Sequence, residues 1–190
     1  MYEVGDLIVY GSMGVCRVEA IGAPPGSAFD PDKSYYTLAP LYKGGHIYAP
    51  TDTSIFMRPV ISRDRALSLI KRIPDIDESV YENETRQVSL LREHYQSLLR
   101  SHDCVDLVHL IKSVYVKRQS LAKNGKSLGQ VEAQFMRQAE DALYEELAVA
   151  LDIPRGDVKA YVEEAVERIK RRVSMAVEAG LTFDEAEPAY

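Results

Sequence analysis

Hydrophobic and polar positions change their spacing near residue 60. Residues 4–59 contain short runs of β-branched and aromatic residues that are separated by Gly- and Pro-rich turns. These runs predict five short strands, which lie at 7–10, 15–21, 35–38, 46–50 and 54–58. So few short strands cannot form a sandwich, and they predict a small, strongly bent SH3- or Tudor-like β-barrel.

From residue 62 onward, apolar residues recur every three or four positions, which predicts helices. Ser62 can cap a first helix that ends before Pro74. Ser127 and Gln130 have the spacing of a capping box and predict a helix start at Ser127. We expect the apolar stripes to form the core, including the following side chains: Leu91, Tyr95, Val108, Val114, Tyr115, Leu143, Leu147 and Val158.

The pattern predicts an α+β chain in which a small N-terminal β-barrel is followed by an all-α helical domain. We place the first domain at residues 1–60 and the helical domain at 61–180. An acidic tail at 181–190 follows, which shows no periodicity. We expect this tail to be flexible or only lightly docked.

The formal net charge of −6 opposes the usual basic character of a nucleic-acid-binding protein. One segment departs from this balance, because residues 112–126 contain five basic residues and no acidic residue. These are Lys112, Lys117, Arg118, Lys123 and Lys126. The segment predicts either a positive patch that reaches phosphates or a solvated helix face.

Two other patterns have simpler explanations. Asn124–Ser127 resembles the end of a phosphate-binding loop, but the residue five positions before Gly125 is Ser120 and no strand precedes it. His102, Asp106 and His109 lie at helical spacing without a second ligand pair, so we expect no metal site. No catalytic motif is present, and we expect a chain that is not an enzyme and has no cofactor or small-molecule substrate.

The chain has no apolar run approaching the ~20 residues that cross a bilayer, and its first residues lack the features of a signal peptide. It contains two cysteines, which is too few for a disulfide framework. We therefore expect a cytoplasmic protein without a membrane partner.

An ordered set of short motifs resembles the CarD family of bacterial transcription regulators and the related polymerase-interacting domain of transcription-repair coupling factor. The set comprises Val4–Tyr10, Gly14–Val15, Glu19–Ile21, Tyr35–Leu38, Ile47–Pro50, Ser101–Asp103 and Glu146–Leu151. Each motif is short, but their order is specific. The chain is too short to contain the helicase of the coupling factor.

The resemblance implies that the N-terminal domain binds the β subunit of RNA polymerase by pairing an edge strand with it. The matching positions are Ile47, Tyr48 and Ala49, with the segment after Ile21 as a neighbour. The helical domain would then contact promoter DNA at the upstream edge of the melted region and help to hold the open complex.

The sequence departs from the family pattern because it contains no Trp, the residue that would wedge into the minor groove. Tyr81 lies near one of the two positions where the family places this residue, and it is the wedge candidate here. With Lys112, Lys117, Arg118, Lys123 and Lys126, it predicts a weak DNA contact that is made mainly to phosphates. The alternative is a Tudor- or SH3-like protein-interaction module with no DNA contact. DNA binding requires the five bases to share one exposed face.

Overall fold

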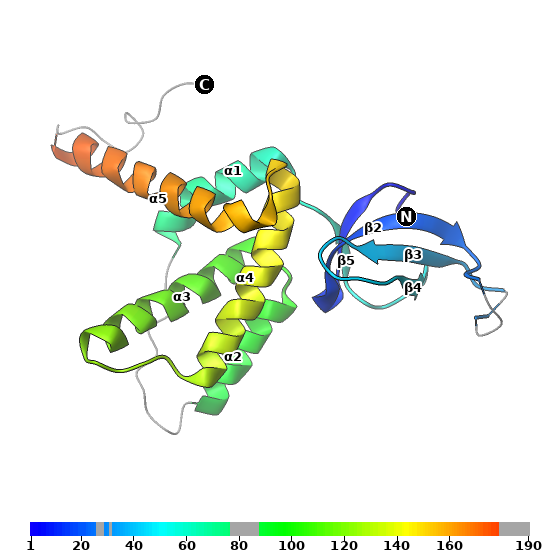
Figure 1. Ribbon diagram of the computed structural model, residues 1–190, viewed down its shortest axis with the longest axis horizontal. Helices are drawn as coiled ribbons and strands as arrows, with labels where there is room; N and C mark the ends of the chain where they lie inside the picture. The colour runs from blue at the N-terminus through cyan, green and yellow to red at the C-terminus, as the bar shows by residue number, and fades with distance from the viewer. Residues whose placement is uncertain (26–28, 31, 77–87, 179–190) are drawn as a thin grey trace.

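The computed structural model describes residues 1–25, 29–30, 32–76 and 88–178, and it has the expected α+β architecture (Figure 1). A sheet built from the N-terminal part of the chain precedes the helices. Its strands are β1 (Leu7–Tyr10), β2 (Gly14–Gly22), β3 (Tyr35–Pro40), β4 (Ile47–Pro50) and β5 (Met57–Pro59), with a 3-10 turn η1 (Gly11–Met13) between β1 and β2.

The sheet is antiparallel and its strand order is β4-β3-β2-β1-β5. In the described residues β4 and β5 do not pair with each other, so the sheet is open and the predicted closure into a barrel is not found. Both edge strands are short and end in proline, at Pro50 and Pro59. Proline has no N–H for a sheet ladder, which limits further pairing at both edges.

Side chains from one face of the sheet form its hydrophobic core, as the alternating pattern predicts. Ile8, Cys16, Val18 and Leu38 are completely buried there, and Ala49 of β4 joins them. Between Val18 and Ala20 the register of β2 against β3 shifts, which marks a β-bulge. The opposite face is covered in part, because Val15 and Tyr35, which project to it, are also buried.

The helices pack around a second core. They are α1 (Arg63–Arg72), α2 (Val88–Arg100), α3 (Cys104–Lys123), α4 (Gln130–Leu151) and α5 (Arg155–Glu178), with a 3-10 turn η2 (Ile73–Asp75) after α1. Tyr95, Leu110, Leu147 and Val158 are buried where these helices meet. Most of the stripe residues named from the sequence are therefore confirmed as core. Tyr115, which is 44% exposed, is an exception, and on α5 Val158 is buried whereas Tyr161 is 39% exposed.

Helix ends test the predicted caps. The Ser62 hydroxyl accepts a hydrogen bond from the Arg65 N–H at 3.2 Å, which confirms the cap of α1. The predicted start at Ser127 is wrong, because α4 begins at Gln130. Its third position is Glu132, whose carboxylate accepts a hydrogen bond from the Gly129 N–H at 3.3 Å. The N-cap is therefore Gly129, two residues later than the sequence predicts, and only the Glu132 half of the predicted box forms because glycine has no side chain to accept a hydrogen bond.

The change from strands to helices falls between Pro59 and Arg63, close to the predicted boundary at residue 60. The division into separate domains stays a prediction. Tyr81 and the predicted tail at 181–190 lie outside the described residues. Within the described part of the chain, no helix is long and apolar enough to cross a membrane.

Candidate functional site

β4 lies at one edge of the sheet and pairs only with β3 in the described structure. Just beyond this pairing, the Thr51 N–H donates to the Ser34 carbonyl at 2.9 Å. Antiparallel pairs alternate between hydrogen-bonded and non-hydrogen-bonded positions, so in this register Ile47 and Ala49 bond to β3. The N–H and carbonyl of Tyr48 therefore point away from β3, toward the open edge.

Pro50 has the same outward orientation as Tyr48, because it lies two residues further along the strand. An outward position on an edge strand is where a missing N–H costs no ladder bond. β4 thus offers one complete main-chain donor and acceptor pair, at Tyr48, and one further acceptor at Pro50. These groups can pair with a strand from another molecule.

The side chains of β4 divide between the two faces of the sheet. Ala49 is buried in the sheet core and Ile47 packs against it. The Tyr48 ring packs edge-to-face on Phe29, with 5.0 Å between ring centroids. Phe29 belongs to the loop between β2 and β3, so this loop reaches the edge strand. The prediction that the segment after Ile21 neighbours the pairing strand is consistent with this contact.

A buried ion pair joins the sheet to the helices. Arg58 of β5 donates to both carboxylate oxygens of Glu146 on α4, and the Glu146 side chain is 2% exposed. The Ile61 N–H also donates to this carboxylate at 3.0 Å, as does the Cys104 thiol at 3.2 Å. The hydrogen bond with Glu146 raises the pKa of Arg58, so the guanidinium stays charged. Burial, reinforced by Glu146, raises the pKa of Cys104 and keeps the thiol protonated as a donor.

His102 contacts the same junction between sheet and helices, through its backbone carbonyl to Arg58 and through its ring to Phe56. Its carbonyl accepts hydrogen bonds from Arg58 Nη2 at 2.7 Å and Nε at 3.2 Å. The ring stacks on Phe56, with 4.6 Å between centroids. His102 adopts φ of 53°, a left-handed conformation that is uncommon for residues other than glycine. Burial and then Arg58 lower the pKa of His102, which favours a neutral imidazole.

A second contact between sheet and helices surrounds Glu145 of α4, which lines a cleft together with Lys43 and Gly14. A Cβ atom at Gly14 would lie 2.0 Å from the Glu145 Oε2 atom, so only glycine allows this approach. Burial raises the pKa of Glu145, and Lys43 partly offsets this effect. Through this contact and the Arg58–Glu146 pair, the sheet is fixed to α4 at two points.

The five bases of residues 112–126 do not share one exposed face. The Lys112 ammonium donates to the backbone carbonyls of Pro74, at 2.9 Å, and Ile76, at 2.5 Å. Lys117 forms an ion pair with Glu132 of α4, and their side chains are only 14% and 11% exposed. These two lysines therefore bind within the fold, because α3 packs closely against its neighbours at their positions.

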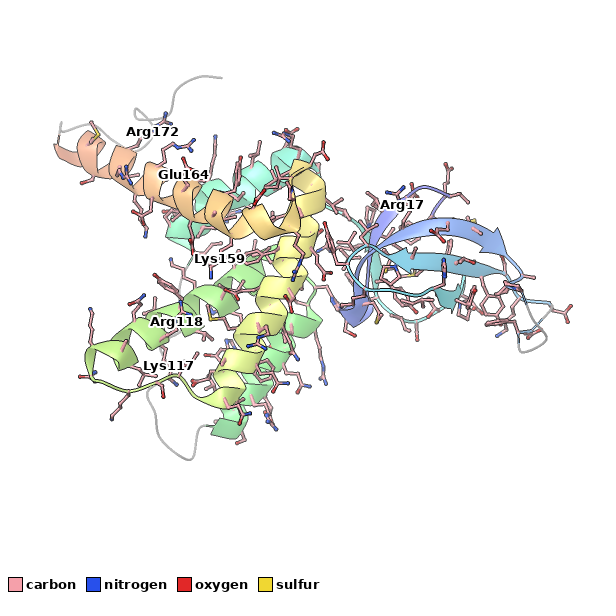
Figure 2. All side chains as sticks on the ribbon, viewed as in Figure 1. Arg17, Lys117, Arg118, Lys159, Glu164 and Arg172 are labelled. Carbon is pink, nitrogen blue, oxygen red and sulfur yellow. The ribbon has the colours of Figure 1, made fainter. Side chains whose placement is uncertain are left out.

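The other three bases lie on the surface. Arg118, Lys123 and Lys126 are exposed, and the Arg118 guanidinium lies 5.2 Å from the centre of the Tyr115 ring. Figure 2 shows Lys117 and Arg118 on α3, with Lys159 and Arg172 along α5. An exposed aromatic ring beside exposed bases is a surface that can contact a nucleic acid. The structure thus reduces the predicted patch to its C-terminal part.

The remaining candidates have ordinary structural roles. Asn124–Ser127 lies between α3 and α4, as expected of a turn that connects two helices. The His109 ring lies 6.0 Å from the His94 ring, whereas His102 stacks on Phe56. No group of three metal-ligating side chains is found in the described ranges, which exclude residues 77–87 and the C-terminal end.

Comparison with known families identifies the sheet. Residues 2–61 match the CarD-like/TRCF RID domain family. This part of the chain is a CarD-like RID domain. The matched residues include all five strands, so the resemblance seen in the motifs is confirmed for this domain. A comparison with curated proteins finds no match to the chain.

RID domains interact with RNA polymerase, and this chain is therefore related to transcription through its N-terminal domain. The predicted positions Ile47, Tyr48 and Ala49 lie on the edge strand of the RID domain. Their role in binding, like that of Tyr81 and the five bases, stays a prediction.

Sequence reasoning missed the junction residues Arg58 and Glu146, and it missed Phe29. Glu146 lies within a motif of the resemblance, but nothing in that motif shows that the carboxylate is buried. An isolated Phe in a Pro-rich loop carries no periodicity, so its contact with Tyr48 was not visible in the pattern.

Proposed function

We propose that this chain is a non-enzymatic regulator of bacterial transcription that binds the β subunit of RNA polymerase through β4. The outward main-chain pair of Tyr48, on the edge strand of a RID domain, carries this proposal. A strand of the β subunit would extend the sheet at this edge. Such pairing requires little of the side chains on β4, because its hydrogen bonds involve the backbone.

The second part of the proposal is a contact with promoter DNA near the upstream edge of the bubble. The five bases do not share one exposed face, so this contact would depend on the three that are exposed. Arg118, Lys123 and Lys126 support it because they are exposed, and the Arg118 guanidinium lies 5.2 Å from the centre of the exposed Tyr115 ring. Contacts to phosphates would be weak and independent of sequence. Tethering on polymerase raises the local concentration of DNA and makes such a weak contact effective. Tyr81 is the proposed wedge at the bubble edge.

The alternative is an interaction module that never touches DNA. It is favoured by the net charge of −6 and by the two lysines of α3 that bind within the fold. The two functions share the polymerase contact and differ in what the helices do. Measurements on the open complex can therefore separate them.

The polymerase contact is tested with the full chain and immobilised core RNA polymerase. Tyr48→Pro removes the outward N–H, and Tyr48→Ala is the matched control because it loses the ring but keeps the N–H. We expect Tyr48→Pro to bind about tenfold or more weakly than Tyr48→Ala, since one hydrogen bond is lost and a partner carbonyl is left unpaired. Equal binding by two folded variants would show that β4 does not pair with polymerase.

The DNA contact is tested by the decay of promoter open complexes formed with polymerase. Replacing Arg118, Lys123 and Lys126 by Glu should shorten the lifetime of the complex. Tyr81→Ala should shorten that lifetime more than it weakens binding to duplex DNA, because a wedge acts at a disturbed base step. Unchanged lifetimes in both variants would favour the module without DNA contact.

A further inference from the structure

Phe29, between β2 and β3, packs its ring against the sheet. Its ring packs edge-to-face on Tyr35, at 5.4 Å between centroids, and on Tyr48, at 5.0 Å. The next residue fixes the loop further, because the Asp30 N–H donates to the Tyr35 hydroxyl at 3.4 Å. The Asp30 carbonyl also accepts a hydrogen bond from the Lys33 N–H at 3.2 Å. The ring of Phe29 is therefore placed by several contacts rather than left free.

These rings lie on the face of the sheet that is opposite the core. Tyr36 and Leu38 of β3 and Ala49 of β4 are in the sheet core, and side chains alternate along a strand. Tyr35 and Tyr48 therefore project to the other face, where Phe29 covers Tyr35 and leaves it only 8% exposed. Phe29 and Tyr48 themselves are half-buried. The result is an aromatic surface that continues up to the open edge of β4.

A strand added to β4 would place one of its side chains on this surface. If that strand is antiparallel, the residue opposite Tyr48 would exchange both main-chain hydrogen bonds with it, and its side chain would project to the same face. Side chains of such a pair lie about 5 Å apart at Cβ. That side chain would therefore lie on the rings of Tyr48 and Phe29.

The charges around the rings indicate which side chain fits. Asp30, which follows Phe29 in the chain, and Asp32 are both exposed, and the Asp30 carboxylate accepts a hydrogen bond from the Asp32 N–H at 3.0 Å. The RID region also has more acidic than basic residues. An aromatic face attracts a cation, and the aliphatic stem of a basic side chain packs well on a ring. Lys33 is the basic residue of this loop, so the loop keeps a net negative charge.

We propose that Phe29, Tyr48 and Asp30 form a specificity site for an Arg or Lys side chain of the β-subunit strand that pairs with β4. This inference rests on the proposed function, because the basic side chain reaches the rings only when that strand is added. It assigns the loop between β2 and β3 a direct part in binding polymerase. The edge supplies the main-chain bonds, and Phe29 and Asp30 select the side chain.

The test measures the affinity of the full chain for core RNA polymerase. Phe29→Leu removes the ring and keeps an apolar side chain, and Phe29→Tyr keeps the ring. Phe56→Leu is the control, because Phe56 is an exposed ring of the same domain beside β5, at the opposite edge. We expect Phe29→Leu to weaken binding about fivefold, which corresponds to one exposed cation–π contact, while Phe29→Tyr and Phe56→Leu bind as the wild type does.

The charge is tested separately with Asp30→Asn and Asp30→Lys. The first should weaken binding slightly and the second several-fold, and both effects should shrink at high salt because exposed charges are screened. If neither changes the affinity, the site takes an uncharged side chain and the proposal for Arg or Lys is wrong. A thermal unfolding midpoint equal to that of the wild type confirms that each variant is folded.

The outcomes distinguish this inference from the proposed function. If Phe29→Leu binds normally and Tyr48→Pro does not, edge pairing stands and the aromatic site is wrong. If Tyr48→Pro binds like Tyr48→Ala, the edge pairing fails and the site at Phe29 fails with it. If Phe29→Leu and Phe29→Tyr weaken binding equally, the ring face is not what the partner recognises, and the inference is overturned.

Discussion

The edge of β4 and the basic segment of α3 offer a partner two different kinds of group. β4 offers the main-chain N–H and carbonyl of Tyr48, which every residue except proline would provide at that position. The α3 segment offers side-chain charges, and its Lys112 and Lys117 are already bound within the fold. A main-chain site depends on where a strand lies in the sheet. A charged site depends on which charges the packing of the helices leaves exposed.

This difference affects how the chain can change without losing function. Side chains on an edge strand can vary while the backbone still pairs, so recognition there is tolerant. A basic helix surface loses one contact whenever an acidic neighbour captures a base, as Glu132 does with Lys117. In this chain the first kind of site has outward main-chain groups at Tyr48, and the second is reduced to three exposed bases.

The largest effect on stability is expected at the Arg58–Glu146 ion pair, which joins the sheet to α4. Arg58→Met leaves the Glu146 carboxylate buried without its partner, and removing one partner of a buried pair costs about 3–5 kcal/mol. Adding Glu146→Gln should recover part of this loss, because the remaining group is neutral and can still accept from the Ile61 N–H. Urea unfolding followed by circular dichroism measures both changes in free energy. Additive losses in the double variant would contradict the coupling.

The next largest effect is a difference in stability between variants of two adjacent bases of α3, Lys117 and Arg118. Lys117→Met leaves Glu132 poorly compensated in a largely buried site, and we expect the free energy of unfolding to fall by about 2–3 kcal/mol. Arg118→Met changes an exposed residue and should alter it by less than about 0.5 kcal/mol. Denaturant unfolding of the two variants provides the measurement. Similar small losses in both would show that Lys117 is as available to DNA as Arg118.

A smaller effect, on binding affinity, should distinguish the basic surface of α3 from the edge of β4. Replacing Arg118, Lys123 and Lys126 by Ala should weaken binding to duplex DNA and reduce the magnitude of the salt slope by about 3, because each phosphate contact contributes about one unit. The same variant should bind core polymerase normally, whereas Tyr48→Pro should show the reverse pattern. Fluorescence anisotropy at several salt concentrations gives the slope. An unchanged slope would remove the DNA contact from α3.

The smallest effect concerns pH. The folded pKa of His102 is lowered, by burial first and by Arg58 second, so protonation favours the unfolded chain. The stability that depends on neutral His102 is present above the unfolded pKa of about 6.5 and is lost as the pH falls through the folded value. His102→Gln should therefore reduce the loss of stability between about pH 7 and pH 5. His94, whose pKa is also lowered, serves as the comparison through His94→Gln. An identical pH profile for His102→Gln and the wild type would contradict the lowered pKa.

Periodicity was enough to predict the order and type of the elements. The β-prone runs at 7–10 and 15–21 are the paired strands β1 and β2, and helical spacing placed Leu91, Tyr95 and Leu147 in the helical core. It failed for Tyr115, because the three-to-four spacing includes residues at the margin of a buried stripe as well as at its centre. The capping-box motif failed for the start of α4, where the Glu132 carboxylate and not the Gln130 amide accepts a hydrogen bond from the N-cap N–H.

The sequence by itself determined that β4 is a strand and that its motifs resemble a RID domain, because both depend on residues that are close together in the chain. Only the tertiary structure decided that β4 is an edge strand, that Tyr48 rather than Ala49 turns its main-chain groups outward, and that Phe29 lies beside it. The same holds for the bases of α3, since Lys117 meets Glu132 only when α4 packs against α3. Such contacts join residues that are distant in the sequence. Whether a charged side chain is exposed or paired therefore depends on which residues the tertiary packing places beside it.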